Sequence, residues 1–142
     1  MSRYLGIDYG EKRIGLAISD PTLTIAQAYK TIHFASKKNL MQQISSIVKE
    51  LEIEKIVLGL PLTMKGSDSK KTTEVREFGE KLNEILSIPV IYFDERLSSV
   101  RAHQILREYG KQPSKSRQKI DQLAAQQILQ TYLDKERRHA DL

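Results

Sequence analysis

The spacing of apolar residues along the 142-residue chain is typical of strands at first and then alternates between helices and short strands. Few architectures are compatible with this order. Two short apolar segments, 3–8 and 13–19, are separated by a turn that contains Gly10. A glycine between two such segments is typical of a hairpin. A third strand is expected over 25–32, with weaker patterning. The first part of the chain therefore predicts an antiparallel meander.

Helical spacing alternates with short buried strands in the remainder. Segments 55–59 and 89–93 are brief apolar runs beside prolines, which is typical of buried parallel strands. Two helices with apolar stripes are expected, one capped by Ser36 and one after the polar loop 61–71. Their stripes contain Leu40, Met41, Ile44, Ile47, Val48 and Leu51, then Val75, Phe78, Leu82, Ile85 and Leu86.

Two more helices are expected in the C-terminal third. Ser98 or Ser99 can cap one that Gly110 ends, and the last spans about 118–133, after a basic linker. The order β-β-β-α-β-α-β-α-α predicts an α/β fold with a mixed five-stranded sheet flanked by helices. Residues 1–142 are expected to form a single domain, because one helix beyond the linker could not fold alone.

Composition narrows the chemistry and the setting. The absence of cysteine excludes disulfides, thiolate zinc sites and cysteine nucleophiles. Neither a signal peptide nor an apolar run long enough to span a bilayer is present, so a soluble, cytoplasmic protein is expected. A net charge of +5 suggests a polyanionic partner, but an ordinary basic enzyme explains it equally well.

Carboxylates are the remaining candidates for catalysis. His33, His103 and His139 have no metal-ligand spacing and are expected to be structural or solvated. Asp8 ends the first strand before a glycine turn, so we expect it exposed at the rim of the sheet, where α/β sites form. The alternative is a turn aspartate that accepts hydrogen bonds from local amides.

Asp94 and Glu95 directly follow the second buried strand. Because strand side chains alternate, only one of the two is expected to face a site at that edge. The other is expected to bind backbone or to pair with Arg96.

Asp121 shares a face of the last helix with Ala124, Ala125 and Ile128. Small neighbours let a helix approach a sheet closely, which would bring this carboxylate to the strand ends. The alternative is an aspartate in the first helical turn, favoured by the helix dipole. Three such acids would make an oxygen-rich site suited to Mg²⁺ or Mn²⁺, and two bridged ions can cleave a phosphodiester.

Four ordered motifs resemble the YqgF family, bacterial RNase H-like proteins related to Holliday-junction resolvases. They are GIDYGEKRIGLAISD at 6–20, GLP at 59–61 with Gly66, DERLSS at 94–99, and KIDQLAA at 119–125 followed by ILQ at 128–130. The resemblance covers essentially the whole chain. It implies an RNase H-like fold and a cytoplasmic nuclease that processes the 5′ end of pre-16S rRNA, with Holliday-junction resolution as the older proposal.

The same resemblance implies roles for individual residues. Asp8, Glu95 and Asp121 match the family's three acids, expected to be catalytic and to bind Mg²⁺ or Mn²⁺; Asp94 is the alternative to Glu95. We expect the substrate, structured RNA such as pre-16S rRNA or branched DNA, to be bound by basic side chains. The candidates are Lys12, Arg13, Lys65, Arg96, Lys115, Arg117 and Lys119.

Other interpretations remain open at this point. The motif Asp8-Tyr9-Gly10 with Gly15 also resembles the first phosphate motif of actin-like ATPases, although a second such loop is missing from the sequence. A non-catalytic RNA-binding module is another possibility, but its acids would repel phosphate without a metal. The basic segment 111–119 is expected to be mobile and to contact substrate, or else to be a solvated patch. A monomer or weak homodimer is expected.

Overall fold

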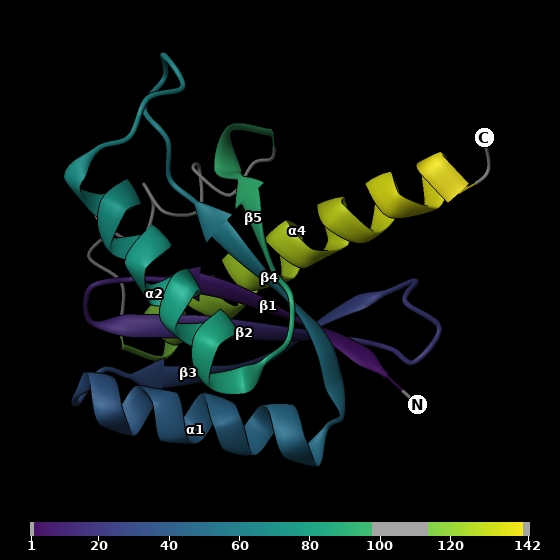
Figure 1. The fold of residues 1–142 in the computed structure, drawn as a ribbon, viewed down its shortest axis with the longest axis horizontal. Helices are drawn as coiled ribbons and strands as arrows, with labels where there is room; N and C mark the ends of the chain where they lie inside the picture. The colour runs from purple at the N-terminus through teal and green to yellow at the C-terminus, as the bar shows by residue number, and fades with distance from the viewer. Residues whose placement is uncertain (1, 98–113, 141–142) are drawn as a thin grey trace.

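The computed structural model describes residues 2–97 and 114–140. Within them the chain forms one five-stranded sheet in the order β3-β2-β1-β4-β5 (Figure 1). The strands are β1 (Arg3–Tyr9), β2 (Arg13–Ser19), β3 (Ala26–His33), β4 (Ile53–Leu60) and β5 (Val90–Asp94). The first three strands pair antiparallel, whereas β1, β4 and β5 are parallel. The mixed five-stranded sheet expected from the sequence is thereby confirmed.

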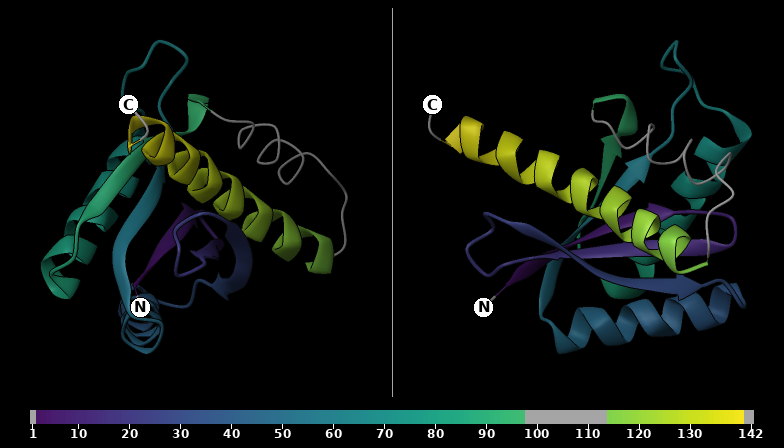
Figure 2. Two further views of the ribbon diagram at one scale, coloured as in Figure 1. Left: turned by 90° about the vertical axis from the view of Figure 1, so that its right-hand side faces the viewer. Right: turned by 180° about the vertical axis from the view of Figure 1, so that it is seen from behind.

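Helices cover both faces of this sheet. The described helices are α1 (Lys37–Glu50), α2 (Lys70–Leu86), the 3₁₀ turn η1 (Glu95–Leu97) and α4 (Ser114–Ala140). Helices α1 and α2 lie on one face and α4 crosses the other, as Figure 2 shows from two sides. Each face therefore has its own hydrophobic core, and the strands are buried between them.

Side chains of β1 alternate between the two cores. Leu5 and Ile7 pack toward α1 and α2, whereas Tyr4 packs toward α4. Gly6 also faces α4, since a Cβ built on it would lie 2.8 Å from Leu129 Cβ. The backbone of the sheet and the helix thus approach more closely than side chains would permit, and Asp8, two residues after Gly6, projects to the same face.

Local sequence explains where the first two helices begin. Ser36 caps α1, as expected, by accepting a hydrogen bond from Asn39 N. Ser69 and Thr72 form a reciprocal capping box at the start of α2. That helix ends at Leu86, and its C-cap Ser87 takes the left-handed conformation with φ of 55°.

The last helix is longer than the sequence predicted. It begins at Ser114, not near Gln118, and continues to Ala140. Residues 114–119 of the expected basic linker are therefore helical, which corrects the expectation that the helix starts after them. The physical reason is composition, because no glycine or proline follows Pro113 and lysine, arginine and glutamine favour helix. Residues 98–113, with the expected third helix and His103, lie outside the described residues.

A polar cluster fixes the C-terminal half of α4 to β4. Lys55 Nζ donates to Glu136 Oε2 at 2.9 Å and to Tyr132 Oη at 3.0 Å, and it lies 4.7 Å from the centre of the Tyr4 ring. Burial disfavours the charge on Lys55, but the hydrogen bonds to Tyr132 and Glu136 outweigh it and raise its pKa. None of the described helices, α4 included, has a stretch apolar enough to cross a membrane.

Candidate active site

Asp8 lies at the carboxyl end of β1 and is only 1 % exposed. The sequence predicted an exposed rim position, and the structure corrects this. The reason is α4, which crosses the sheet over this strand end. A buried carboxylate needs compensating partners or a cation, because desolvation disfavours its charge.

Asp121 lies on α4 directly over β2. A Cβ built on Gly15 would come within 2.0 Å of the Asp121 carbonyl oxygen, and Gly15 is the register partner of Asp8. Asp121 is fully buried, and its neighbours Ala124, Ala125 and Ile128 are buried with it. The predicted inward face of this helix is confirmed. Asp121 also lies beyond the first turn, which has no acidic residue, so the helix-dipole alternative does not apply.

Glu95 approaches from the other side of Asp8. A Cβ built on Gly59 would lie 2.7 Å from Glu95 Oε1. Ile7 pairs with Leu58, so the next residues along these parallel strands, Asp8 and Gly59, are neighbours. Gly15 and Gly59 therefore flank Asp8, and each lies beneath one of the other two acids. This arrangement places Asp8, Glu95 and Asp121 at one strand end, on one face.

Asp94 points elsewhere. Its carboxylate accepts hydrogen bonds from Arg96, at 2.7 Å from Nη2 and 3.0 Å from Nε, while the neighbouring Glu95 is buried. The hydrogen bonds from the Arg96 guanidinium hold the pKa of Asp94 below its usual value. Arg96 Nη1 also donates to Met64 O at 3.3 Å, so this pair fastens the loop after β4 to the end of β5.

The basic residues expected to bind substrate do not form one cluster. They lie at the start of β2, around the loop after β4, and on α4. Arg13 Nε donates to Asp121 Oδ2 at 2.7 Å, which neutralises a buried acid. Lys65 is exposed on the loop after β4, and Lys119 is exposed on α4. Arg96 is held by Asp94, as described above. The Lys115 backbone is helical, and its side chain lies outside the described residues.

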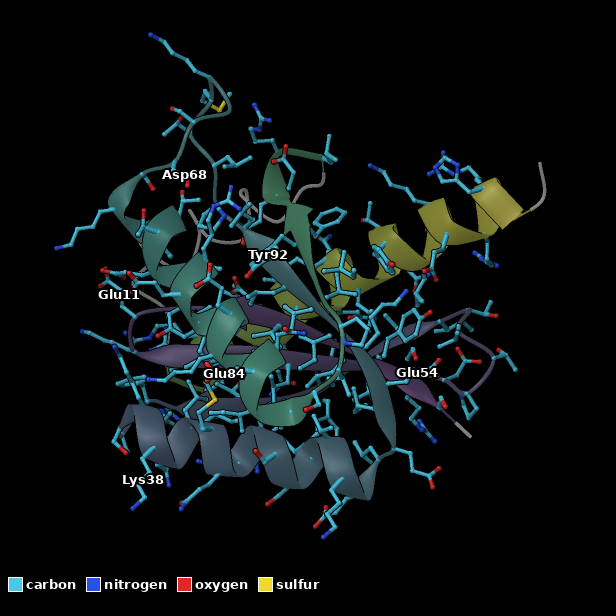
Figure 3. All side chains as sticks on the ribbon, in the orientation of Figure 1. Glu11, Lys38, Glu54, Asp68, Glu84 and Tyr92 are labelled. Carbon is cyan, nitrogen blue, oxygen red and sulfur yellow. The ribbon has the colours of Figure 1, made fainter. Side chains whose placement is uncertain are left out.

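A pocket of about 390 Å³ adjoins Asp121. Its lining residues are Gly10, Glu11, Lys12, Arg13, Lys71, Arg117 and Asp121. Glu11 is labelled in Figure 3 at the turn between β1 and β2. The sequence predicted Lys12, Arg13 and Arg117 as contacts for phosphate but missed Lys71. Lys71 could have been recognised from its position in the first turn of α2, the helix that follows the loop after β4.

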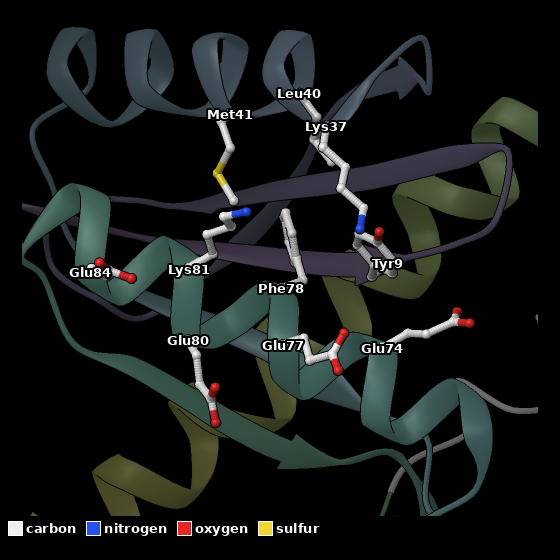
Figure 4. Close-up of a pocket in the computed structure, with 10 residues that line it drawn as sticks. All are labelled: Tyr9, Lys37, Leu40, Met41, Glu74, Glu77, Phe78, Glu80, Lys81 and Glu84. Carbon is white, nitrogen blue, oxygen red and sulfur yellow. The ribbon is translucent and has the colours of Figure 1, made fainter.

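A larger cavity, of about 650 Å³, lies on the opposite face between α1 and α2. Figure 4 shows Tyr9 and Phe78 in it, with four glutamates that α2 contributes. These are Glu74, Glu77, Glu80 and Glu84, against two lysines, Lys37 and Lys81. Burial and then the charge of Glu74 raise the pKa of Tyr9. An acidic cavity repels a polyanion, so the smaller basic pocket is the better candidate for substrate binding despite its size.

The donor set around Asp8 fits a hard divalent cation. Its three acids are carboxylates, and His33 instead lies 3.0 Å from the Gln118 side-chain amide. Oxygen donors of this kind suit Mg²⁺ or Mn²⁺. No group of three acidic or histidine side chains among the described residues is already arranged around a common metal position. Two effects explain why the three acids do not surround a common position. Their like charges repel one another, and the hydrogen bond from Arg13 holds Asp121 in place.

Comparison with solved structures identifies the fold. The chain superposes on Thermus thermophilus RuvC in complex with a Holliday junction substrate with a TM-score of 0.60, covering 96% of each chain at 12% identity. A second T. thermophilus RuvC structure gives 0.56 at 10% identity, covering 94% of this chain and 96% of that one. The RNase H-like fold is thereby shown.

Comparison of sequences identifies the family. A protein of Caldanaerobacter subterraneus subsp. tengcongensis named "Putative pre-16S rRNA nuclease" is 47% identical over 137 residues, 95% of this chain and 98% of that protein. A protein of the same name from Chloroflexus aggregans is 44% identical over 133 residues, 94% of each. Residues 2–135 match the RuvX family, described as Holliday junction resolvase and also named YqgF. The chain therefore belongs to the RuvX family.

Proposed function

We propose that this protein is a divalent-metal-dependent nuclease that hydrolyses phosphodiester bonds in structured nucleic acid. The observation that carries the proposal is the placement of Asp8, Glu95 and Asp121, buried together over Gly15 and Gly59. Three carboxylates alone would repel a phosphate, so their burial beside a basic pocket makes sense when a cation lies between them and the substrate.

The three acids would hold Mg²⁺ or Mn²⁺ through their oxygens, and a metal bound there would supply activation of water and stabilisation of the leaving oxygen. The chain supplies the remaining requirements. The sheet and α4 shield the acids from bulk water, which strengthens electrostatic interactions there. Lys12 and Arg117 would position the substrate backbone beside the acids, as phosphate contacts commonly do.

The proposed substrate is the 5′ end of pre-16S rRNA, in line with the names of the curated relatives. Branched DNA is the second candidate, because the family is described as Holliday junction resolvase and the RuvC match was solved with a junction. Processing of ribosomal RNA would place the protein in the cytoplasm. We further propose a single domain that acts as a monomer or weak homodimer, which sedimentation over a concentration series would test.

Cleavage assays distinguish these candidates. A transcript carrying the 5′ precursor segment of 16S rRNA and a four-way DNA junction are incubated with the protein in Mg²⁺, in Mn²⁺ and in EDTA. We expect metal-dependent cleavage of the RNA at the mature 5′ end and no cleavage in EDTA. Cleavage of the junction alone would favour the resolvase. Binding to RNA without cleavage in any metal would overturn the enzyme proposal in favour of a binding module.

A further inference from the structure

The basic pocket beside Asp121 contains a buried cationic nitrogen that lacks a partner. Arg117 Nε is shielded from solvent and makes no hydrogen bond in the structure. Buried polar groups are almost always paired, and an unpaired one on a charged group is costly. Since Arg117 also lines the pocket, its Nε would gain a partner if the guanidinium turned toward a hydrogen-bond acceptor held there.

The net positive charge of the pocket indicates that such a ligand is an anion. Four cationic side chains, Lys12, Arg13, Lys71 and Arg117, line it together with two carboxylates, Glu11 and Asp121, so the formal charge is +2. Arg13 and Asp121 neutralise each other. The excess therefore comes from the other three cations against Glu11 alone, and an anion would balance it.

Two helices contribute their first turns to the same pocket. Lys71 belongs to the first turn of α2 and Arg117 to the first turn of α4. Neither turn contains an acidic residue. The positive end of a helix dipole favours an anion, most of all within the first turn. The two helix ends add to the side-chain charges here and do not carry the argument by themselves.

We infer that this pocket binds a phosphate group of the nucleic-acid strand other than the one that is cleaved. The inference rests on the proposed function for the nature of the strand. The pocket adjoins the acids through Asp121 but is lined mainly by cations, so it would hold a neighbouring phosphate and set the cleaved bond relative to it. A 5′-terminal phosphate and an internal phosphate share this chemistry, and the +2 charge matches a terminal dianion.

Binding of inorganic phosphate tests the pocket without catalysis. Isothermal titration and thermal unfolding are run in EDTA, with chloride at equal ionic strength as the reference. We expect phosphate to raise the Tm of the wild type, and Arg117→Gln and Lys71→Gln each to weaken binding at least tenfold. Arg138→Gln, at the far end of α4, and Lys81→Gln, on α2, are the matched controls and should bind as the wild type does.

Stability separates a lost ligand contact from a damaged fold. Because Arg117→Gln removes a buried Nε donor that has no hydrogen-bond partner, its Tm without phosphate should equal or exceed that of the wild type. The increase in Tm with phosphate should disappear. If Arg117→Gln binds phosphate as the wild type does, or if the wild type binds none, the inference is wrong, whatever the cleavage assays give.

Oligonucleotides with a 5′-phosphate or a 5′-hydroxyl identify the source of the phosphate. They are titrated against wild type and Arg117→Gln in EDTA. Tighter binding of the 5′-phosphate form to the wild type alone would assign the pocket to a strand terminus. Equal binding of both forms, weakened equally by the substitution, would assign it to an internal phosphate. An affinity that the substitution leaves unchanged for both forms would contradict the inference.

Discussion

Arg13 and Asp121, 108 positions apart in the sequence, are joined by a 2.7 Å hydrogen bond from Nε to Oδ2. Asp121 is fully buried and Arg13 is 17 % exposed. The pair ties the start of β2 to α4 at the edge of the basic pocket. A divalent ion that used Asp121 as a ligand would compete with Arg13 for the same carboxylate.

Replacing Arg13 by glutamine should therefore lower the stability of the protein and make that stability depend more strongly on bound metal. We expect Arg13→Gln to lower the free energy of unfolding by about 3 kcal/mol, the low end for removing one partner of a buried pair, because Arg13 is partly exposed. Mn²⁺ should then raise the Tm of this variant more than that of the wild type, since binding to the native state stabilises it. An equal rise in both proteins would show that Arg13 and the metal do not compete.

Asp8→Asn should abolish cleavage while the fold is retained. The amide has nearly the same shape as the carboxylate but no charge with which to hold a metal ion. We expect a loss of at least 100-fold in rate and an unchanged circular dichroism spectrum, with Asp134→Asn on α4 as the control. Wild-type rates in Asp8→Asn would remove Asp8 from the mechanism.

Asp94 and Glu95 should differ although they are adjacent. Glu95→Gln is expected to be inactive, because Glu95 lies against Gly59 beside Asp8. Asp94→Asn should keep most of its activity and become more sensitive to proteolysis in the loop after β4, since Arg96 would lose its ionic partner. Single-turnover rates at saturating substrate measure the first effect and limited trypsin digestion the second. The opposite ranking would make Asp94 the ligand.

The Asp94–Arg96 pair also predicts a dependence on acid. The pKa of Asp94 is lowered from its model-peptide value of 3.8, mainly by its hydrogen bond to Arg96. A lowered pKa in the native state contributes stability that is present above the unfolded pKa and is lost as the pH falls through the folded pKa. Below about pH 4, Asp94→Asn should therefore approach the wild type in Tm, and a constant difference in Tm down to pH 2 would exclude this contribution.

Gly15→Ala should displace Asp121. The added methyl group would meet the Asp121 carbonyl at 2.0 Å, so the backbone of α4 must shift. We expect a loss of about 1–3 kcal/mol in stability, as for other overpacked cores, together with weaker metal binding. Gly66→Ala is the comparison, since its φ of 83° strains alanine and the nearest atoms that its Cβ would meet belong to the Arg96 guanidinium and not to one of the three acids. The Gly66→Ala variant should lose stability but bind metal normally. If both variants bind metal with the same affinity, Gly15 has no part in positioning the metal-binding acids.

The sequence predicted most of the secondary structure because the information was local. Caps such as Ser36, strand lengths and the small inward face of the last helix are all set by neighbouring residues. The start of that helix was missed because lysine-rich polar segments resemble linkers, although their helix propensity is high. The burial of Asp8 was missed for a different reason. It depends on α4, more than 100 residues further along the chain.

Contacts between distant segments were the least predictable part of the site. Family motifs indicated the three acids, but nothing in the local pattern paired Arg13 with Asp121 or brought Lys71 to the same pocket as Arg117. Those contacts follow from where α2 and α4 begin on the sheet. The separation of Asp94 from Glu95 was predictable, since alternation along a strand requires no tertiary information.

The glycines beneath the acids have a consequence for protein design. A designer who placed three carboxylates on another sheet, with full side chains at the positions of Gly15 and Gly59, would hold the helix and the 3₁₀ turn farther from the strands. The three acids would then lie farther apart than they do here. A design that reproduces this site must therefore copy five residues, the three acids and the two glycines. The glycines are needed because they have no side chain and leave room for the acids.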